Sequence, residues 1–126
     1  MVEVTIQSLS TYSKLQTTAA SLTALAGVVV RAGVITAAYA AQGTVATSAD
    51  EQMSIALTKD SGDTAVSTAV VLSSGNTNDV AVTLPILATG VAHVAVGDVL
   101  KIALTYTAGS AAVPQLDTIV TIEVTH

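Results

Sequence analysis

MSIALTKDSGDTAVSTAVVL, residues 53–72, contains two alternating runs separated by a polar turn. In the first run, Met53, Ile55 and Leu57 alternate with small or hydroxylic residues. A turn with a glycine follows, and the alternation then resumes through Val66, Thr68, Val70 and Leu72. Period-2 runs on both sides of such a turn predict a β-hairpin. The opposite face of both strands carries Ala, Ser and Thr, where a monomeric soluble protein usually places Lys and Glu, so the sequence raises the question of what this surface contacts.

The same period of two recurs along most of the chain. Further strands are expected at residues 2–6, 34–41, 80–86, 99–106 and 120–124. In the strand at 34–41, Ile35, Ala37 and Tyr39 are expected to share a face, and Pro85 marks an edge strand or a strand end. Short strands separated by turns predict an all-β fold, a single-domain antiparallel β-sandwich that is jelly-roll-like. The predicted core residues are Ile55, Leu57, Leu100, Ile102, Leu104, Val120, Ile122 and Val124.

Residues 15–27, LQTTAASLTALAG, fit two interpretations. Their Leu and Ala residues lie near helical spacing, and Gly27 could be the C-cap of a short helix. Three threonines count against a helix, so a strand or an extended arm is expected. No internal repeat or long linker is visible. We therefore expect one domain overall, with an N-terminal strand or arm at residues 1–27, available for contacts between subunits, and a β-sandwich at residues 28–126.

The composition is apolar but contains few aromatic residues. Of the 126 residues, 51% are hydrophobic, 10% are charged and 2% are aromatic, with no Phe or Trp. The longest apolar run, residues 24–30, ends at Arg31 and is far shorter than the roughly 20 residues that a membrane-spanning helix needs. The N-terminus lacks the features of a signal peptide. The sequence therefore predicts a soluble chain without a membrane partner.

Charge and cysteine content exclude further classes of function. The four basic residues are scattered among nine acidic ones, which gives a net charge of -5 and no basic stripe for binding phosphates. A nucleic-acid partner is therefore not expected. Because the chain has no Cys, disulfides, thiolate metal sites and cysteine nucleophiles are excluded.

The residues that could carry chemistry have simpler structural interpretations. His93 lies five residues before Asp98, but Gly-Asp at residues 97–98 is more simply a turn that enters a strand. Asp60 and Asp63, and the pair at residues 50–51, lack the regular spacing of a calcium loop and are expected to be solvated acids of turns. The sequence therefore predicts no enzyme, no catalytic residue, no metal site and no cofactor.

The sparse charge suggests that part of the surface is covered when the protein works. A chain of this mass exposes roughly 6,000 Å² when it folds alone. Only thirteen side chains, 10% of the residues, are charged, whereas about 25 to 35% of the surface of a free small domain is expected to be charged. Small, β-branched and hydroxylic faces suit close packing against copies of the same chain or against a larger shell. The alternative is a monomeric domain that is rich in Thr and Ser and weakly charged.

Four pieces of the sequence carry a resemblance to a known family: AGVI at 32–35, GTVATSAD at 43–50, IALTKDSGD at 55–63 and VGDVLKI at 96–102. They resemble a pattern found in small virion proteins of tailed bacteriophages, in which a run of the form aGtI…a…a.lGtaPTg.dl.idv.kdGt precedes a later aGDvltvdlt strand. The likeness covers residues 28–107, and the closing LDTIVTIEVT strand fits the same plan. The chain departs from the pattern at residues 45–47, which lack the proline, and after Gly62, where Asp63 replaces Thr.

The resemblance implies a β-sandwich or jelly-roll component of a phage particle, on the surface of the head. We expect a capsid decoration, or cement, protein that binds and stabilises the assembled shell. Its partners would be the major capsid protein and further copies of itself, as a homotrimer, because proteins of this kind commonly cluster about local three-fold axes. The alternative is a head-fibre or tail-fibre module that recognises a host surface glycan.

The N-terminal strand is the expected anchor. It could add to an exposed strand edge of a neighbour through main-chain hydrogen bonds. The candidate assembly contacts are Val2, Val4, Thr5 and Ile6.

Overall fold

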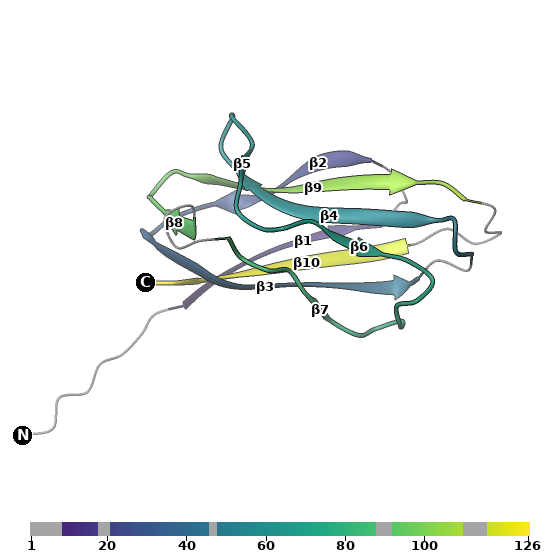
Figure 1. Cartoon of the computed structure of the whole chain (residues 1–126). Coiled ribbons are helices and arrows are strands. Elements are labelled where there is room, and N and C mark those ends of the chain that lie inside the picture. Colours follow the sequence, from purple (N-terminus) through teal and green to yellow (C-terminus); the bar gives the residue numbers. More distant parts are fainter. Residues whose placement is uncertain (1–8, 18–20, 46–47, 88–91, 110–115) are drawn as a thin grey trace, which may run out of the picture.

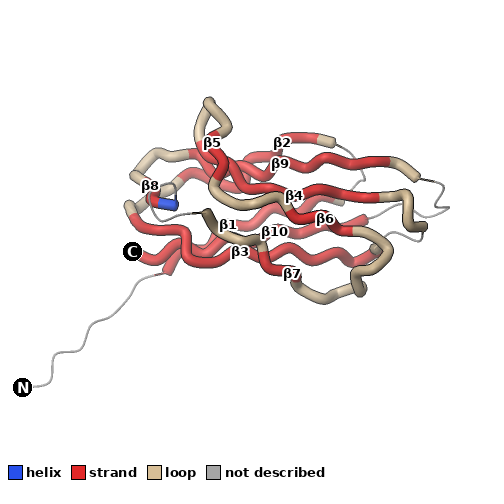
Figure 2. Tube along the Cα trace, in the orientation of Figure 1, coloured by secondary structure: helices blue, strands red, loops and turns tan. Residues whose placement is uncertain are grey.

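The computed structural model describes residues 9–17, 21–45, 48–87, 92–109 and 116–126 and places them in two β-sheets that face each other (Figure 1). Ala92 is the only described residue in a helical conformation (Figure 2). No helix in these ranges is long and apolar enough to cross a membrane. The strands are β1 (Leu9–Gln16), β2 (Leu22–Val28), β3 (Gly33–Thr44), β4 (Gln52–Lys59), β5 (Thr64–Ala65), β6 (Val70–Leu72), β7 (Val82–Thr83), β8 (His93–Val94), β9 (Val99–Thr107) and β10 (Leu116–Thr125).

The strand order is that of a jelly roll. Sheet A has the order β1-β10-β3-β7, with β8 also paired to β3, and sheet B has the order β2-β9-β4-β5, with β6 also paired to β4. Each sheet therefore has four strand positions, and β1 to β4 alternate between the two sheets. The pairings are antiparallel. Eight antiparallel positions in two sheets form the jelly-roll architecture, so the predicted antiparallel, jelly-roll-like β-sandwich is confirmed.

The core lies between the sheets and is built by the alternating strands. Met53, Ile55 and Leu57 of β4 are at most 1% exposed, and they face inward with alternate residues of β9 and β10. Burying an aliphatic side chain of this size contributes about 1.5 to 3 kcal/mol relative to leaving it exposed. All eight predicted core residues are buried.

The hairpin quoted above forms, but its second strand is interrupted. β5 and β6 both pair with β4, on either side of Ser67. At this point the chain turns toward residues 85–87, because the Thr68 amide donates to the Pro85 carbonyl (2.9 Å) and Ser67 makes an isolated bridge to Ile86. Val66 and Leu72 are buried as the alternation predicts, whereas Thr68 is exposed.

The predicted face of β3 is wrong. Ile35 is buried, whereas Tyr39 is 47% exposed on the opposite side of the sheet. The register with β10 shifts between Glu123 and Val124: Val124 lies opposite Ile35, and Glu123 lies opposite Ala37. One extra residue on β3 is therefore accommodated as a β-bulge, which reverses the side to which the following residues point.

Residues 9–17 and 21–28 are part of the sandwich. β1 pairs with β10 in sheet A along its whole length, and β2 pairs with β9 in sheet B. The prediction of strand at residues 15–27 is confirmed where the chain is described. The boundary expected after residue 27 falls inside β2, which is a strand of sheet B, and the described sandwich begins at Leu9. The predicted strand at residues 2–6 lies outside the described residues.

Candidate interaction surface

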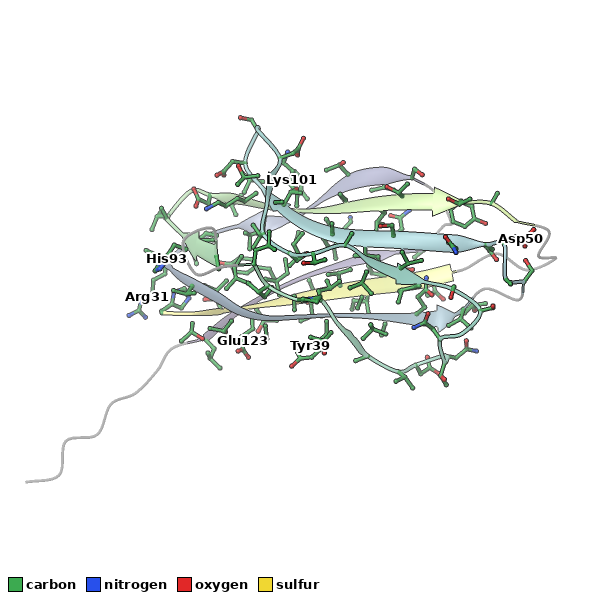
Figure 3. All side chains as sticks on the ribbon, viewed as in Figure 1. Arg31, Tyr39, Asp50, His93, Lys101 and Glu123 are labelled. Carbon is green, nitrogen blue, oxygen red and sulfur yellow. The ribbon has the colours of Figure 1, made fainter. Side chains whose placement is uncertain are left out.

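The outer side of sheet A is a face of small, hydroxylic and aliphatic side chains. Side chains alternate along each strand, so those between the buried residues point away from sheet B. The pairing registers of β1, β10 and β3 place these outward side chains in rows across the sheet. One row joins Leu15, Ile119 and Ala41, and the next joins Ser13, Thr121 and Tyr39. Figure 3 shows Tyr39 and Glu123 pointing away from the other sheet. We define face A as Leu9, Thr11, Ser13, Leu15, Ala37, Tyr39, Ala41, Ile119, Thr121 and Glu123.

Face A has almost no charge. Glu123 is the one charged residue among those defined as face A, and its carboxylate accepts a hydrogen bond from the Thr36 hydroxyl (2.9 Å). A second carboxylate, that of the exposed Asp117, lies at the end of this face beside Gly43, where β10 begins in a left-handed backbone conformation (φ 54°). Hydroxyl groups lie across the middle of the face, where Ser13 Oγ and Thr121 Oγ1 are 3.3 Å apart. The face can therefore offer hydrogen bonds and apolar contact but little Coulomb attraction.

The outer side of sheet B repeats this pattern. Lys101 is its one charged member, and its Nζ lies 2.6 Å from the carboxylate of Asp63. The exposed carboxylate of this pair is screened by water, so the pair contributes little to stability. We define face B as Thr23, Leu25, Ser54, Ala56, Thr58, Val71, Lys101, Ala103 and Thr105.

Most of the remaining charge lies in turns. Asp60, Asp63 and Asp79 have positive φ (63°, 50° and 60°), a conformation that Asp adopts more readily than most residues. Asp60 also accepts a hydrogen bond from the Val99 amide (3.1 Å), and Asp98 accepts one from the Ala95 amide (2.9 Å). Figure 3 shows Arg31 and Asp50 at opposite ends of the sandwich. These acids therefore build turns, and no group of three metal-ligating side chains occurs in the described ranges.

His93 lies on an edge strand, and Asp98 belongs to the turn that follows that strand. His93 is exposed on β8, and its carbonyl accepts a hydrogen bond from Lys59 Nζ (2.8 Å). Asp98 holds the turn at residues 95–98 that enters β9, so the prediction of a turn there is confirmed. The predicted assembly contacts Val2, Val4, Thr5 and Ile6 lie outside the described residues.

His126 has a structural role that the sequence pattern did not reveal. Its Nδ1 lies 2.9 Å from the Ala32 carbonyl, so Nδ1–H is the donor there. Nε2 then accepts a hydrogen bond from the Ser10 hydroxyl (2.5 Å). The imidazole thus links the end of β10, the beginning of β1 and the loop before β3.

The prediction that Glu51 is a solvated acid of a turn is wrong. Glu51 is fully buried, and Tyr106 Oη donates a hydrogen bond to its Oε1 (2.5 Å). This hydrogen bond, with partial burial and the negative charge of Glu51, raises the pKa of Tyr106. Asp50 accepts a hydrogen bond from the Ser48 hydroxyl (2.5 Å) in the preceding loop. The adjacent acidic residues thus have different roles. The alternating pattern of β4 does not extend into this loop, so the sequence could not predict that one of them is buried.

Comparison with protein-family models, curated proteins and solved structures finds no match for this chain. The described residues also form no pocket. The candidate interaction site is therefore the molecular surface, and its most unusual parts are the two nearly uncharged faces.

Proposed function

We propose that this protein is a structural component of a bacteriophage particle, a capsid decoration protein that binds the assembled shell. The observation that carries the proposal is the contrast between a net charge of -5 and two broad faces with few charged side chains. A free domain benefits from charge spread over its whole surface. A domain that packs against a shell or its own copies benefits from flat, neutral, small-residue faces.

The resemblance of residues 28–107 to small phage virion proteins supports the same role, and the jelly-roll architecture is compatible with it. In this proposal the protein performs no catalysis and acts by mass action. A protein that binds only the assembled shell stabilises it by RT ln(1 + [L]/Kd) per site, or about 2.7 kcal/mol at a hundredfold excess over Kd. Its partners are the major capsid protein and further copies of itself, for which the resemblance implies a homotrimer.

Binding to empty shells tests the proposal. Purified protein is mixed with the shells of the phage that encodes it and is sedimented through a gradient. We expect the protein to sediment with the shells and to raise their temperature of disassembly. A protein that stays at the top of the gradient, with shells of unchanged stability, would contradict a decoration role.

The alternative, a fibre module that recognises a glycan, is favoured by one specific observation. Tyr39 lies on the β3 side of face A with 47% of its surface exposed, and an exposed aromatic ring can pack on the apolar side of a sugar. A glycan array separates the two functions. Binding of a defined glycan that Tyr39→Ala abolishes, without any binding to shells, would favour the fibre module.

A further inference from the structure

β1 is the least protected of the strand edges in the sandwich. The opposite edge of sheet A is β7, which has two residues and lies next to Pro85. In sheet B, β2 has a bulge between Leu25 and Gly27, and β5 and β6 form an interrupted edge. β1 has eight residues in unbroken register with β10, without Pro or a bulge. Among the described residues, no strand pairs with its other side.

Such an edge usually requires protection. A long, regular edge strand presents a row of main-chain donors and acceptors to any compatible strand, and natural proteins block it with short strands, bulges, Pro or charges. The other three edge regions are short, bulged or interrupted. β1 has a single device of this kind, the half-buried and inward-pointing charge of Lys14, and no charge on its outward side. The outward residues Leu9 and Leu15 are 58% and 51% exposed.

We propose that β1 pairs with β1 of a second copy of this chain, antiparallel and centred on Tyr12, so that the two A sheets become one continuous sheet. In this register Leu9 lies opposite Leu15 of the second copy, and Thr11 lies opposite Ser13. Each apolar side chain then meets an apolar partner at both ends of the strand, and the hydroxyl groups meet in the middle. Cross-strand pairs of this kind stabilise sheets.

Other registers do not have this complementarity. A shift by one residue would pair outward with inward side chains. A shift by two residues would place Leu9 opposite Ser13 or opposite Thr17, which follows β1, and the leucines would no longer lie opposite each other. The strand is thus self-complementary in one register, and this favours a second copy over an unrelated partner. The absence of charge on the outward side of β1 also removes like-charge repulsion across the two-fold axis.

The size of the contact predicts a weak pair. An eight-residue strand is about 27 Å long and gains one neighbour at about 4.8 Å. Pairing therefore covers a few hundred square ångströms per molecule, less than the about 800 Å² of a standard interface. We expect a Kd of about 10 µM to 1 mM in solution. The contact is two-fold, so it differs from any contact that closes a trimer, and it does not depend on the proposed function because it forms between free copies.

Cysteine cross-linking tests the register, and the natural chain contributes no cysteine of its own. Thr11→Cys and Ser13→Cys proteins are mixed under oxidising conditions. Directly opposite residues lie within reach of a disulfide, whereas two copies of residue 11 are diagonal neighbours at about 7 to 8 Å and are too far apart. We expect a disulfide-linked heterodimer from the mixture and far less dimer from either protein alone.

Two controls complete the experiment. Thr121→Cys lies on face A but in the middle of the sheet, so its mixture with Thr11→Cys should not cross-link. The variant with both Thr11→Lys and Ser13→Lys should lose self-association in sedimentation velocity at about 1 mM protein, with an unchanged melting temperature, because both side chains are exposed. No heterodimer from the first mixture, equal cross-linking of Thr121→Cys, or undiminished association of the lysine variant would each overturn the proposal.

Discussion

At the scale of single residues, acidic side chains that occur in similar loop sequences differ in burial. Glu51 is buried beneath the Tyr106 hydroxyl, whereas Asp60 and Asp63 build a turn. Alternation along a strand identifies the core well because it depends only on local geometry. The fate of a loop acid depends on which distant strand covers it, and this is why Glu51 was not predicted.

Ile102 tests the core. It is 1% exposed between the sheets, so Ile102→Ala removes buried methyl groups and leaves a cavity. We expect the free energy of unfolding to fall by about 2 to 5 kcal/mol in a denaturant titration. Thr105→Ala, on the outer side of the same strand, should change it by about 0.5 kcal/mol or less. A loss below about 1 kcal/mol for Ile102→Ala would place this face outside the core.

Gly27 tests close packing between β2 and β1. A Cβ added there would lie 2.6 Å from Tyr12 Cδ1, so the tyrosine ring would have to move. We expect Gly27→Ala to destabilise the protein by about 1 to 3 kcal/mol, as measured by thermal unfolding. Gly62→Ala is the matched control, since an added Cβ there meets no atom within 4 Å. If both variants unfold like the parent, the packing of Tyr12 on Gly27 is not tight.

The Tyr106–Glu51 hydrogen bond predicts a dependence of stability on pH. The pKa of Tyr106 is raised above 10.0 in the folded protein, so above that pH the unfolded chain loses a proton that the folded protein keeps. Stability is therefore fully present below about pH 10 and falls as the pH rises toward the folded-state pKa. Tyr106→Phe should be less stable at neutral pH by about 1 to 3 kcal/mol. It should also lose stability less steeply between pH 10 and the folded-state pKa, and parallel pH profiles for the two proteins would contradict this role.

At the scale of elements, the long strands follow from the sequence and their irregularities do not. β4, β9 and β10 alternate as predicted. The bulge in β3 and the interruption at Ser67 depend on the partner strands, β10 in one case and residues 85–87 in the other. A bulge is a property of a strand pair, so the alternation pattern of one strand alone cannot predict it. The exposure of Tyr39 was missed for this reason.

Ser67 tests the interruption. Its Oγ accepts a hydrogen bond from the buried Leu57 amide (2.8 Å). Ser67→Ala removes this acceptor, and we expect a loss of about 1 to 3 kcal/mol in the free energy of unfolding. Hydrogen exchange at the Leu57 amide should also accelerate. Thr68→Ala, one residue later and exposed, serves as the control, and equal effects of the two changes would show that the Ser67 hydroxyl does not support β4.

At the scale of the whole molecule, charge is concentrated in the turns and is nearly absent from both faces of the sandwich. The sequence predicts that the surface is sparsely charged, because counting residues suffices for this. It does not predict that the neutral side chains gather on two faces. That arrangement depends on the jelly-roll topology, which brings β1, β10 and β3 together although they are far apart in the sequence. In the proposed decoration role, the protein would therefore contact a shell through apolar and main-chain contacts, which salt screens weakly.

The number of copies per particle after a salt wash tests this account most directly. To test the proposed decoration role, phage particles that carry the protein are washed in about 1 M sodium chloride, where the Debye length falls to about 3 Å and exposed ion pairs fade. The remaining protein is then counted by quantitative mass spectrometry against the major capsid protein. We predict that hundreds of copies remain per particle. A handful of copies before the wash, or loss of the protein during it, would contradict a decoration protein held by neutral faces.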